Sequence, residues 1–133
     1  MRFLALFFIA LLGHLGVAWA QTDYPRQPIR LVVGFASGGI SDVLARAIAT
    51  KMSLQLGQQV IVDNKPGAGT TIAADIVSHA APDGYTLFFQ DITSHAINTA
   101  LYAKLPYDSI KDFTPVGMIA STPLMLVVHP SSS

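Results

Sequence analysis

The chain has 133 residues, of which 51% are hydrophobic and 12% are charged, and its mean hydropathy is +0.47. This composition excludes a disordered or fibrous chain, and the length suits one domain. The 8 basic and 8 acidic side chains balance without a basic stripe, so we expect no binding to nucleic acid. The absence of cysteine excludes disulfide frameworks, thiolate zinc sites, iron–sulfur clusters and a cysteine nucleophile.

The first 20 residues have the pattern of a secretory signal peptide. Arg2 precedes an apolar run over residues 3–12, and the segment ends in Ala18-Trp19-Ala20, an A-x-A cleavage site. An uncleaved membrane anchor over residues 3–20 is the alternative, because that stretch is just long enough to span a bilayer. We expect export to a bacterial periplasm and cleavage after Ala20, since a cysteine-free exported chain fits that compartment.

Strands and helices alternate along the rest of the chain. The predicted strands cover residues 29–35, 60–63, 85–89, 116–120 and 124–128. The predicted helices cover residues 41–56, with Gly57 as C-cap, a segment beginning at Thr70 or Thr71, and a segment beginning near Ser94. Three successive strand–loop–helix units imply a parallel sheet with right-handed crossovers, so the fold class is α/β.

The spacing of apolar residues predicts which helix faces are buried. The first helix is expected to turn Leu44, Ala47, Ile48 and Met52 inward, and the third helix Ala96, Ile97, Ala100 and Leu101. Asp42 and Arg46 fall on the solvent face of the first helix, where their i,i+4 spacing allows an ion pair.

Three loops follow the first three strands at the carboxyl edge of the sheet, where open parallel sheets bind ligands. Each loop leads into a helix N-terminus, whose free N–H groups can hold an anion. Glycines at positions 38, 39, 67 and 69 let the backbone approach a ligand closely, and Lys65 is the one cation in these loops. The pattern predicts a site that holds a small carboxylate with neutral donors. The alternative is that the glycines serve turns and the hydroxyls cap helices.

Other site motifs fail at particular residues. The phosphate-binding loop is absent, and a dinucleotide fingerprint needs glycine where Ala36 stands. A nucleophile elbow around Ser37 needs glycine in place of Phe35. A secreted hydrolase that uses Ser37 with His95 as base is the second function class, and the missing elbow argues against it. The histidines show no metal-ligand spacing.

Three polar residues keep alternative interpretations. Asp63 ends the second strand, where it can bind a ribose, cap a helix or form a turn. His95 can face the ligand, cap the third helix or lie in solvent. Asp91 in the third loop can repel an anion, cap the helix, or select a ligand that carries an amine.

A series of short motifs resembles the Bug/TctC-type solute-binding proteins, the periplasmic receptors of tripartite tricarboxylate transporters. The resemblance includes Gly38-Gly39 followed by Asp42, the run NKPGAG at residues 64–69 and the run APDGYTL at residues 81–87. It covers essentially the whole mature chain. Two departures are Gly34 and Ala36, where the family usually has prolines, which implies a more mobile first loop. A third is Asp91, where the family usually has a small or hydroxyl residue, which leaves the ligand class open.

This resemblance implies a two-lobed periplasmic-binding-protein fold of type II, with a doubly wound sheet that closes on a small carboxylated ligand. It implies no catalysis and no cofactor, delivery of the ligand to membrane permease subunits, and a monomer for the full-length receptor. Residues 21–133 then form the N-terminal part of lobe one, without the second lobe. Two interpretations follow: a truncated receptor or a non-functional gene fragment. The ligand-binding positions carried over from the family are Phe35, Ser37, Gly38, Gly39, Asp42, Gly69, Thr70, Thr71, Thr93, Ser94 and His95.

Cleavage of the leader is directly measurable. Mass spectrometry of the protein recovered from the periplasm is expected to find an N-terminus at Gln21, because the A-x-A site ends at Ala20. Recovery of a chain that begins with Met1 in the membrane fraction would contradict cleavage and favour the anchor.

Overall fold

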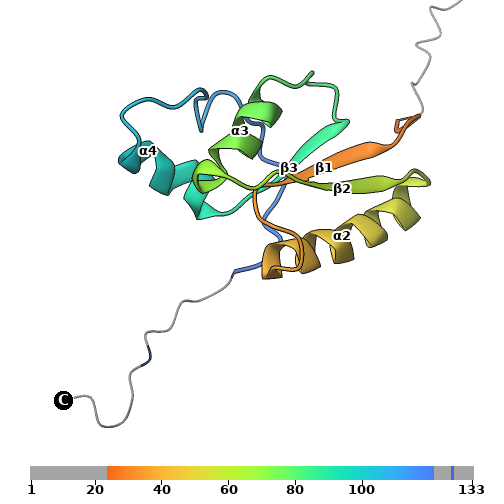
Figure 1. The fold of residues 1–133 in the computed structure, drawn as a ribbon. Helices are drawn as coiled ribbons and strands as arrows, with labels where there is room; N and C mark the ends of the chain where they lie inside the picture. Colours follow the sequence, from red (N-terminus) through yellow and green to blue (C-terminus); the bar gives the residue numbers. More distant parts are fainter. Residues whose placement is uncertain (1–23, 122–126, 128–133) are drawn as a thin grey trace, which may run out of the picture.

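The computed structural model describes residues 24–121 and residue 127, and the account below concerns those residues (Figure 1). The strands are β1 (Ile29–Val33), β2 (Val60–Asn64) and β3 (Thr86–Phe89). The helical elements are α2 (Ile40–Leu56), the single turn η1 (Ala68–Thr70), α3 (Thr71–Ser78), the wide π-type turn η2 (Thr93–Ile97) and α4 (Asn98–Leu101). No helix among these residues is long and apolar enough to cross a membrane.

The three strands form one parallel sheet in the order β2-β1-β3. The first strand in the sequence, β1, is therefore the central strand of the sheet. Val33 at its end pairs with Asn64 on one side and Phe89 on the other. Parallel neighbours separated by a helix require crossover connections, which agrees with the alternation expected from the sequence. The α/β class with a parallel sheet is confirmed.

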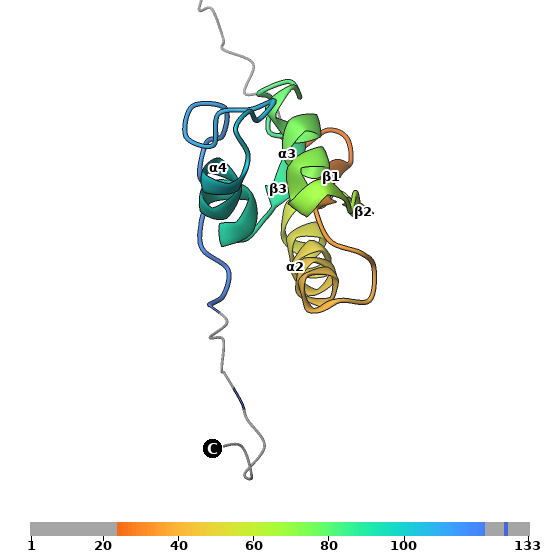
Figure 2. The same ribbon diagram turned by 60° about the vertical axis from the view of Figure 1, so that its left-hand side comes forward.

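Helices cover both faces of the sheet (Figures 1 and 2). Helix α2 packs against β1 and β2, and α3 packs on the opposite face against β3 and β1. Side chains along β1 alternate accordingly, with Ile29, Leu31 and Val33 in the core under α2 and Val32 fully buried toward the other face. The central strand is therefore buried on both faces, as its continuous apolar run predicted.

The buried face of α2 differs from the predicted one. Its buried residues are Asp42, Ala45 and Ala49, whereas Ala47 is exposed and Leu44 and Ile48 are partly buried. The predicted inward residue Met52 is partly buried and packs against the core. The two alanines lie at the contact because their small side chains let the helix approach the strands closely. The apolar pattern of the sequence therefore predicted a helix face about one residue away from the face that is buried. It also wrongly placed Asp42 on the solvent face. The C-cap was right, since Gly57 adopts a left-handed conformation and its N–H donates to Ser53 O at 3.1 Å.

The third helical segment also faces inward through polar residues. The predicted inward residues Ala96, Ile97, Ala100 and Leu101 are all exposed. Ser94 and Asn98 are each only 1% exposed instead. The segment begins as a π-type turn, whose wider spacing rotates the helix relative to an α-helical pattern.

The predicted strand at residues 116–120 is absent from the described structure. Those residues form an extended but unpaired segment, in which Val116 and Met118 are each 88% exposed. The strand predicted at residues 124–128 lies outside the described residues except for Val127, which is exposed.

One glycine is required by packing at the end of β1. Gly34 is buried, and a Cβ at this position would lie 2.8 Å from Thr70 Cβ. Thr70 itself is 4% exposed and has a left-handed backbone with φ of 74°. Glycine therefore lets the end of the central strand contact the loop after β2.

The close contact predicts that Gly34→Ala destabilises the chain. Overpacking of this kind costs about 1–3 kcal/mol, so the midpoint of urea denaturation should fall. The double variant Gly34→Ala/Thr70→Gly should recover much of the lost stability. Its second substitution removes the Thr70 side chain that obstructs the new Cβ, and glycine suits the positive φ at position 70. Gly117→Ala is the matched control, because a Cβ there meets nothing within 4 Å. Equal effects of Gly34→Ala and Gly117→Ala would contradict the packing argument.

Candidate functional site

The three loops at the carboxyl edge of the sheet lie next to one another. They follow β1, β2 and β3 and comprise residues 34–39, 65–70 and 90–92. Because β1 lies between its two neighbours in register, the first loop leaves the sheet between the second and the third. This edge is where parallel α/β sheets bind ligands.

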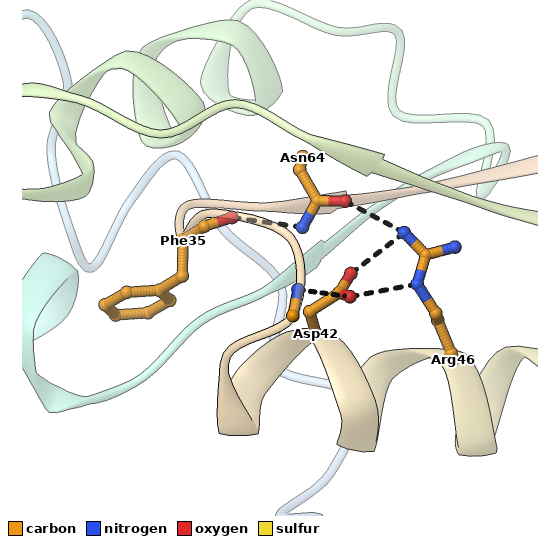
Figure 3. Close-up of polar contacts among 5 residues, drawn as sticks. Phe35, Asp42, Arg46 and Asn64 are labelled. Carbon is orange, nitrogen blue, oxygen red and sulfur yellow. Dashed lines mark hydrogen bonds and ion pairs between the residues drawn. The ribbon is translucent and has the colours of Figure 1, made fainter.

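A buried carboxylate holds the first loop against α2 (Figure 3). Asp42 Oδ2 accepts the Gly38 N–H at 2.9 Å and the Arg46 Nε–H at 3.0 Å, and Arg46 Nη2 lies 3.0 Å from Asp42 Oδ1. These hydrogen bonds, the one from Arg46 first, lower the pKa of Asp42 to about 2. The pair predicted from the i,i+4 spacing is confirmed, and it also fixes the turn that precedes the helix.

Asn64 extends this network to the neighbouring strand. Its Oδ1 accepts a hydrogen bond from Arg46 Nη2 at 3.2 Å, and its Nδ2 donates to Phe35 O at 3.0 Å. The Lys65 N–H also donates to Val33 O at 2.8 Å. The first loop is thus tied on one side to α2 and on the other to the end of β2 (Figure 3).

The anchored loop leaves its tip open to solvent. Ser37, Gly38 and Gly39 are exposed, and Gly39 is the N-cap of α2 without a side-chain hydrogen bond. The amide N–H groups of the first helical turn have no intrahelical acceptor, and the helix dipole adds a partial positive charge there. The loop tip therefore offers backbone donors on its open side, whereas Asp42 in the first turn of α2 lies on the buried side.

The second loop has a run of unusual backbone conformations. Ala68, Gly69 and Thr70 have φ values of 46°, 60° and 74°. Non-glycine residues in this region store strain that is common at functional sites. Thr70 Oγ1 is buried and has no hydrogen-bond partner among the described residues, whereas Thr71 Oγ1 donates to Ala68 O at 2.8 Å.

The segment after β3 fastens the second loop from the far side. Asn98 Nδ2 donates to Gly69 O at 2.6 Å, which explains why this polar side chain is buried. Tyr102 OH donates weakly to Ala68 O at 3.4 Å. Hydrogen bonds therefore hold the first loop to α2 and to the end of β2, and separately hold the second loop to α4 and Tyr102.

The third loop is ordered by its own polar side chains. Asp91 Oδ1 accepts the Thr93 N–H at 2.8 Å, so the aspartate forms the turn that starts the helical segment. Ser94 Oγ donates to Gln90 Oε1 at 2.8 Å, and Ser94 O accepts a hydrogen bond from Tyr107 OH at 2.9 Å. The Ser94 hydroxyl therefore serves the loop itself, and Asp91 has the turn-forming role that was one of its alternatives.

His95 lies in an aromatic cluster. Its ring centroid is 5.4 Å from that of Phe113, which also neighbours Phe88 and Tyr107. His95 Nδ1 is buried without a hydrogen-bond partner in the described part of the chain.

Positive charges near the loops are engaged by acids. Arg30 Nη2 lies 2.6 Å and Lys65 Nζ 3.2 Å from the Asp63 carboxylate. Burial raises the pKa of Asp63, but the hydrogen bonds from Arg30 and Lys65 outweigh burial and hold that pKa below its ordinary value. Asp63 is therefore an ion-pairing residue at the end of β2, and Lys65 is not a free cation.

The predicted site residues divide into three groups by exposure. The exposed ones are Ser37, Gly38, Gly39 and Gly69; the partly buried ones are Phe35, Thr71, Thr93 and His95; the buried ones are Asp42, Thr70 and Ser94. Sequence reasoning missed Arg46, Asn64 and Asn98 as residues that hold the loops. The position of Asn64 at a strand end was a usable signal, but nothing local marked Asn98.

The structure lends no support to a hydrolase. Across residues 24–121, no hydrogen bond joins Ser37 to a histidine, and no group of three or more His, Asp or Glu side chains could hold a metal ion. Two shallow depressions lie along α2 and β2; one of them is lined by Arg46, and neither is lined by a residue of the three loops.

The Asp42 network predicts a specific pH dependence of stability. Because the folded pKa of about 2 lies below the ordinary value of 3.8, Asp42 stabilises the fold above about pH 4, and this contribution is lost as the pH falls toward 2. Asp42→Asn should therefore lower the urea midpoint at pH 7 and flatten its decline between pH 4 and pH 2. Asp83→Asn, which removes an exposed turn carboxylate at the other end of the sheet, is the control. A decline as steep in Asp42→Asn as in the unmodified chain would contradict this role.

Comparison with known proteins agrees with this architecture. Residues 44–133 match the sequence model of the tripartite tricarboxylate transporter family receptor. The chain is 40% identical over 124 residues to Protein BugT of Bordetella pertussis, an alignment that covers 92% of this chain and 38% of the relative. It is 46% identical over 111 residues to a protein from the TAR-I ttuE-ttuC' intergenic region of Agrobacterium vitis, covering 84% of this chain and 32% of the relative.

Two solved structures share the fold. MatC from Rhodopseudomonas palustris with bound malate has a TM-score of 0.69 and 45% identity, covering 72% of this chain and 33% of MatC. A second R. palustris protein, solved with adipate, has a TM-score of 0.68 and 42% identity, covering 70% of this chain and 31% of the neighbour. The chain thus spans about a third of the length of its relatives. The periplasmic-binding-protein fold and the resemblance found in the sequence are confirmed, and the chain belongs to the family of tripartite tricarboxylate transporter receptors.

Proposed function

We propose that this chain forms one wall of a binding site for a small carboxylate in a periplasmic solute-binding receptor. The observation that carries the proposal is the first loop, whose open tip Ser37-Gly38-Gly39 is anchored by the ion-paired Asp42 beneath it. A loop held by hydrogen bonds, with exposed backbone donors, can bind a carboxylate with little reorganisation. The malate and adipate bound to the two R. palustris proteins are small carboxylates, which supports the same class of ligand here.

The remaining site positions have graded roles in this proposal. The exposed Gly39 and Gly69 allow the backbone to approach the ligand, and the partly buried Thr71 and Thr93 line the approach. Asp42 and Ser94 act on their own loops and not on the ligand, because their side-chain oxygens are engaged internally. No step of this function requires catalysis or a cofactor.

The whole receptor is larger than the wall described here. Residues 1–20 are proposed as a cleaved leader, and residues 21–133 as the N-terminal part of lobe one. The alignments cover only about a third of each relative, so we propose that the second wall of the cleft belongs to the part of the receptor that these residues do not match. Delivery of the ligand to membrane permease subunits, by a receptor that is a monomer, completes the proposal.

Amide chemical shifts of the ¹⁵N-labelled chain during titration with malate or adipate test the site. One wall leaves the ligand hydrated on one side, so we expect a dissociation constant in the roughly millimolar range. The largest shifts should fall on residues 37–41 and 68–71. Gly39→Val should weaken binding, because its side chain would stand over the backbone donors.

The structure makes Gly39→Val a clean test of binding. Gly39 has φ of −77°, and a Cβ there would meet only Ala36 O at 3.5 Å, so the fold should be retained. Ala47→Val, on an exposed position of the same helix, is the control and should bind as the unmodified chain does. Shifts confined to residues outside the three loops, or an unchanged affinity in Gly39→Val, would place the ligand elsewhere.

A further inference from the structure

The sheet has two edge strands, β2 and β3, and they differ in how their edges are protected. At β2, the Ser53 hydroxyl accepts the Val60 N–H at 2.8 Å, and the end of the strand carries the ion-paired side chains of Asp63 and Lys65. Charged side chains and satisfied backbone groups keep an edge strand from pairing with another chain. Strand β3, with the sequence TLFF, has no charged residue.

The backbone of β3 is unpaired on its outer side. The Arg30 N–H donates to Tyr85 O at 2.8 Å, and in a parallel ladder alternate residues of a strand bond to the same neighbour. The N–H and C=O groups of Thr86 and Phe88 therefore point away from β1. Within residues 24–121, no hydrogen bond engages these groups. The outer side of β3 can therefore accept one more strand.

An uncharged arm, residues 114–121, leaves the domain beside this edge. It follows Phe113, whose ring packs against that of Phe88 on β3 with centroids 5.8 Å apart. The arm is extended and unpaired, all eight of its residues are exposed, and it leads away from the sheet (Figures 1 and 2). Val116 and Met118 are each 88% exposed, and Ile119 is 54% exposed. Apolar and β-branched residues of this kind are typical of a strand.

The arm fits the unpaired edge of a second copy of the chain. Residues 116–120 equal β1 in length and exceed β3 by one residue. Neither the arm, with the sequence TPVGMIAS, nor β3 carries a charge, so their pairing buries no unpaired ion. Phe113 is held over its own β3 and the arm points away from there, whereas the β3 of another copy can approach the arm along its length. Exchange of identical elements between two copies gives a closed dimer.

We propose that two copies of this chain exchange arms, so that residues 116–120 of each copy pair with the outer side of β3 in the other. Each arm supplies hydrogen-bond partners to the outward backbone groups of Thr86 and Phe88, and it removes apolar side chains from water. This inference goes beyond the proposed function. It concerns the chain of 133 residues, whereas the monomer proposed above is the whole receptor.

Analytical ultracentrifugation of the chain recovered from the periplasm, over a range of concentrations, is expected to show a monomer–dimer equilibrium. Met118→Lys places a charge in the exchanged strand. It should raise the dissociation constant of the dimer roughly tenfold or more, because pairing would bury that charge without a partner.

Ile110→Lys is the matched control for this substitution. Ile110 is 85% exposed and precedes the arm, so this variant gains the same charge at a similarly exposed position. Both variants should fold as the unmodified chain does, because neither side chain is packed in the described structure. Ile110→Lys should also dimerise as the unmodified chain does.

Amide hydrogen exchange of the ¹⁵N-labelled chain tests where the arm pairs. The N–H groups of Thr86 and Phe88 should exchange more slowly as the protein concentration rises, because the dimer supplies their acceptors. This protection should be lost in Met118→Lys and retained in Ile110→Lys.

Three results would overturn the proposal. Protection of Thr86 and Phe88 that does not change with concentration would mean that the arm pairs with its own β3. A dimer that is equally stable in Met118→Lys would form through another surface. Sedimentation as a monomer at every concentration, with both amides unprotected, would leave the edge of β3 unpaired.

Discussion

The geometry of the loops at the carboxyl edge of the sheet depends on the buried side chain of Asp42, near the start of α2. Asp42 is only 4% exposed, and a buried charge is tolerated only when it is paired and hydrogen-bonded. Arg46 supplies the charge from one turn further along the helix, and the Gly38 N–H supplies the donor from the loop. The need to hydrogen-bond the buried Asp42 carboxylate therefore fixes the conformation of the turn before α2.

The same requirement propagates to the neighbouring loops. Arg46 also donates to Asn64, and Asn64 holds the Phe35 carbonyl, so the ends of β1 and β2 are joined through side chains as well as through the sheet. Gly34 then lets Thr70 pack against the first loop, and Asn98 holds the Gly69 carbonyl from the other side. The first and second loops are held by neighbouring elements and the third by its own side chains. Loops that are fixed before a ligand arrives lose little conformational entropy on binding.

Under the proposed function, the three loops would hold a carboxylate without a free cation. Arg30, Arg46 and Lys65 are committed to Asp42 and Asp63, so the open side of the loops presents backbone N–H groups and hydroxyls. Recognition by neutral donors depends on their direction and spacing, which the hydrogen bonds that hold the first and second loops would maintain. Asp91 is the exception, because its charge meets no basic side chain in residues 24–121.

Local features of the sequence were sufficient to predict the alternation of strands and helices, the parallel sheet, the C-cap at Gly57 and the Asp42–Arg46 pair. Each of these depends on residues within a few positions of one another or on the apolar pattern. The motif resemblance identified the family. Three features were decided only in the tertiary structure: the burial of Asp42, Ser94 and Asn98, the exposure of Ile97 and Leu101, and the absence of pairing at residues 116–120. The side-chain partner of Asn98, the Gly69 carbonyl, lies 29 residues away, and the Tyr107 hydroxyl that covers the Ser94 carbonyl lies 13 residues away. A polar side chain is buried when such a distant partner satisfies its hydrogen bonds, and no periodicity along the chain records where that partner will be.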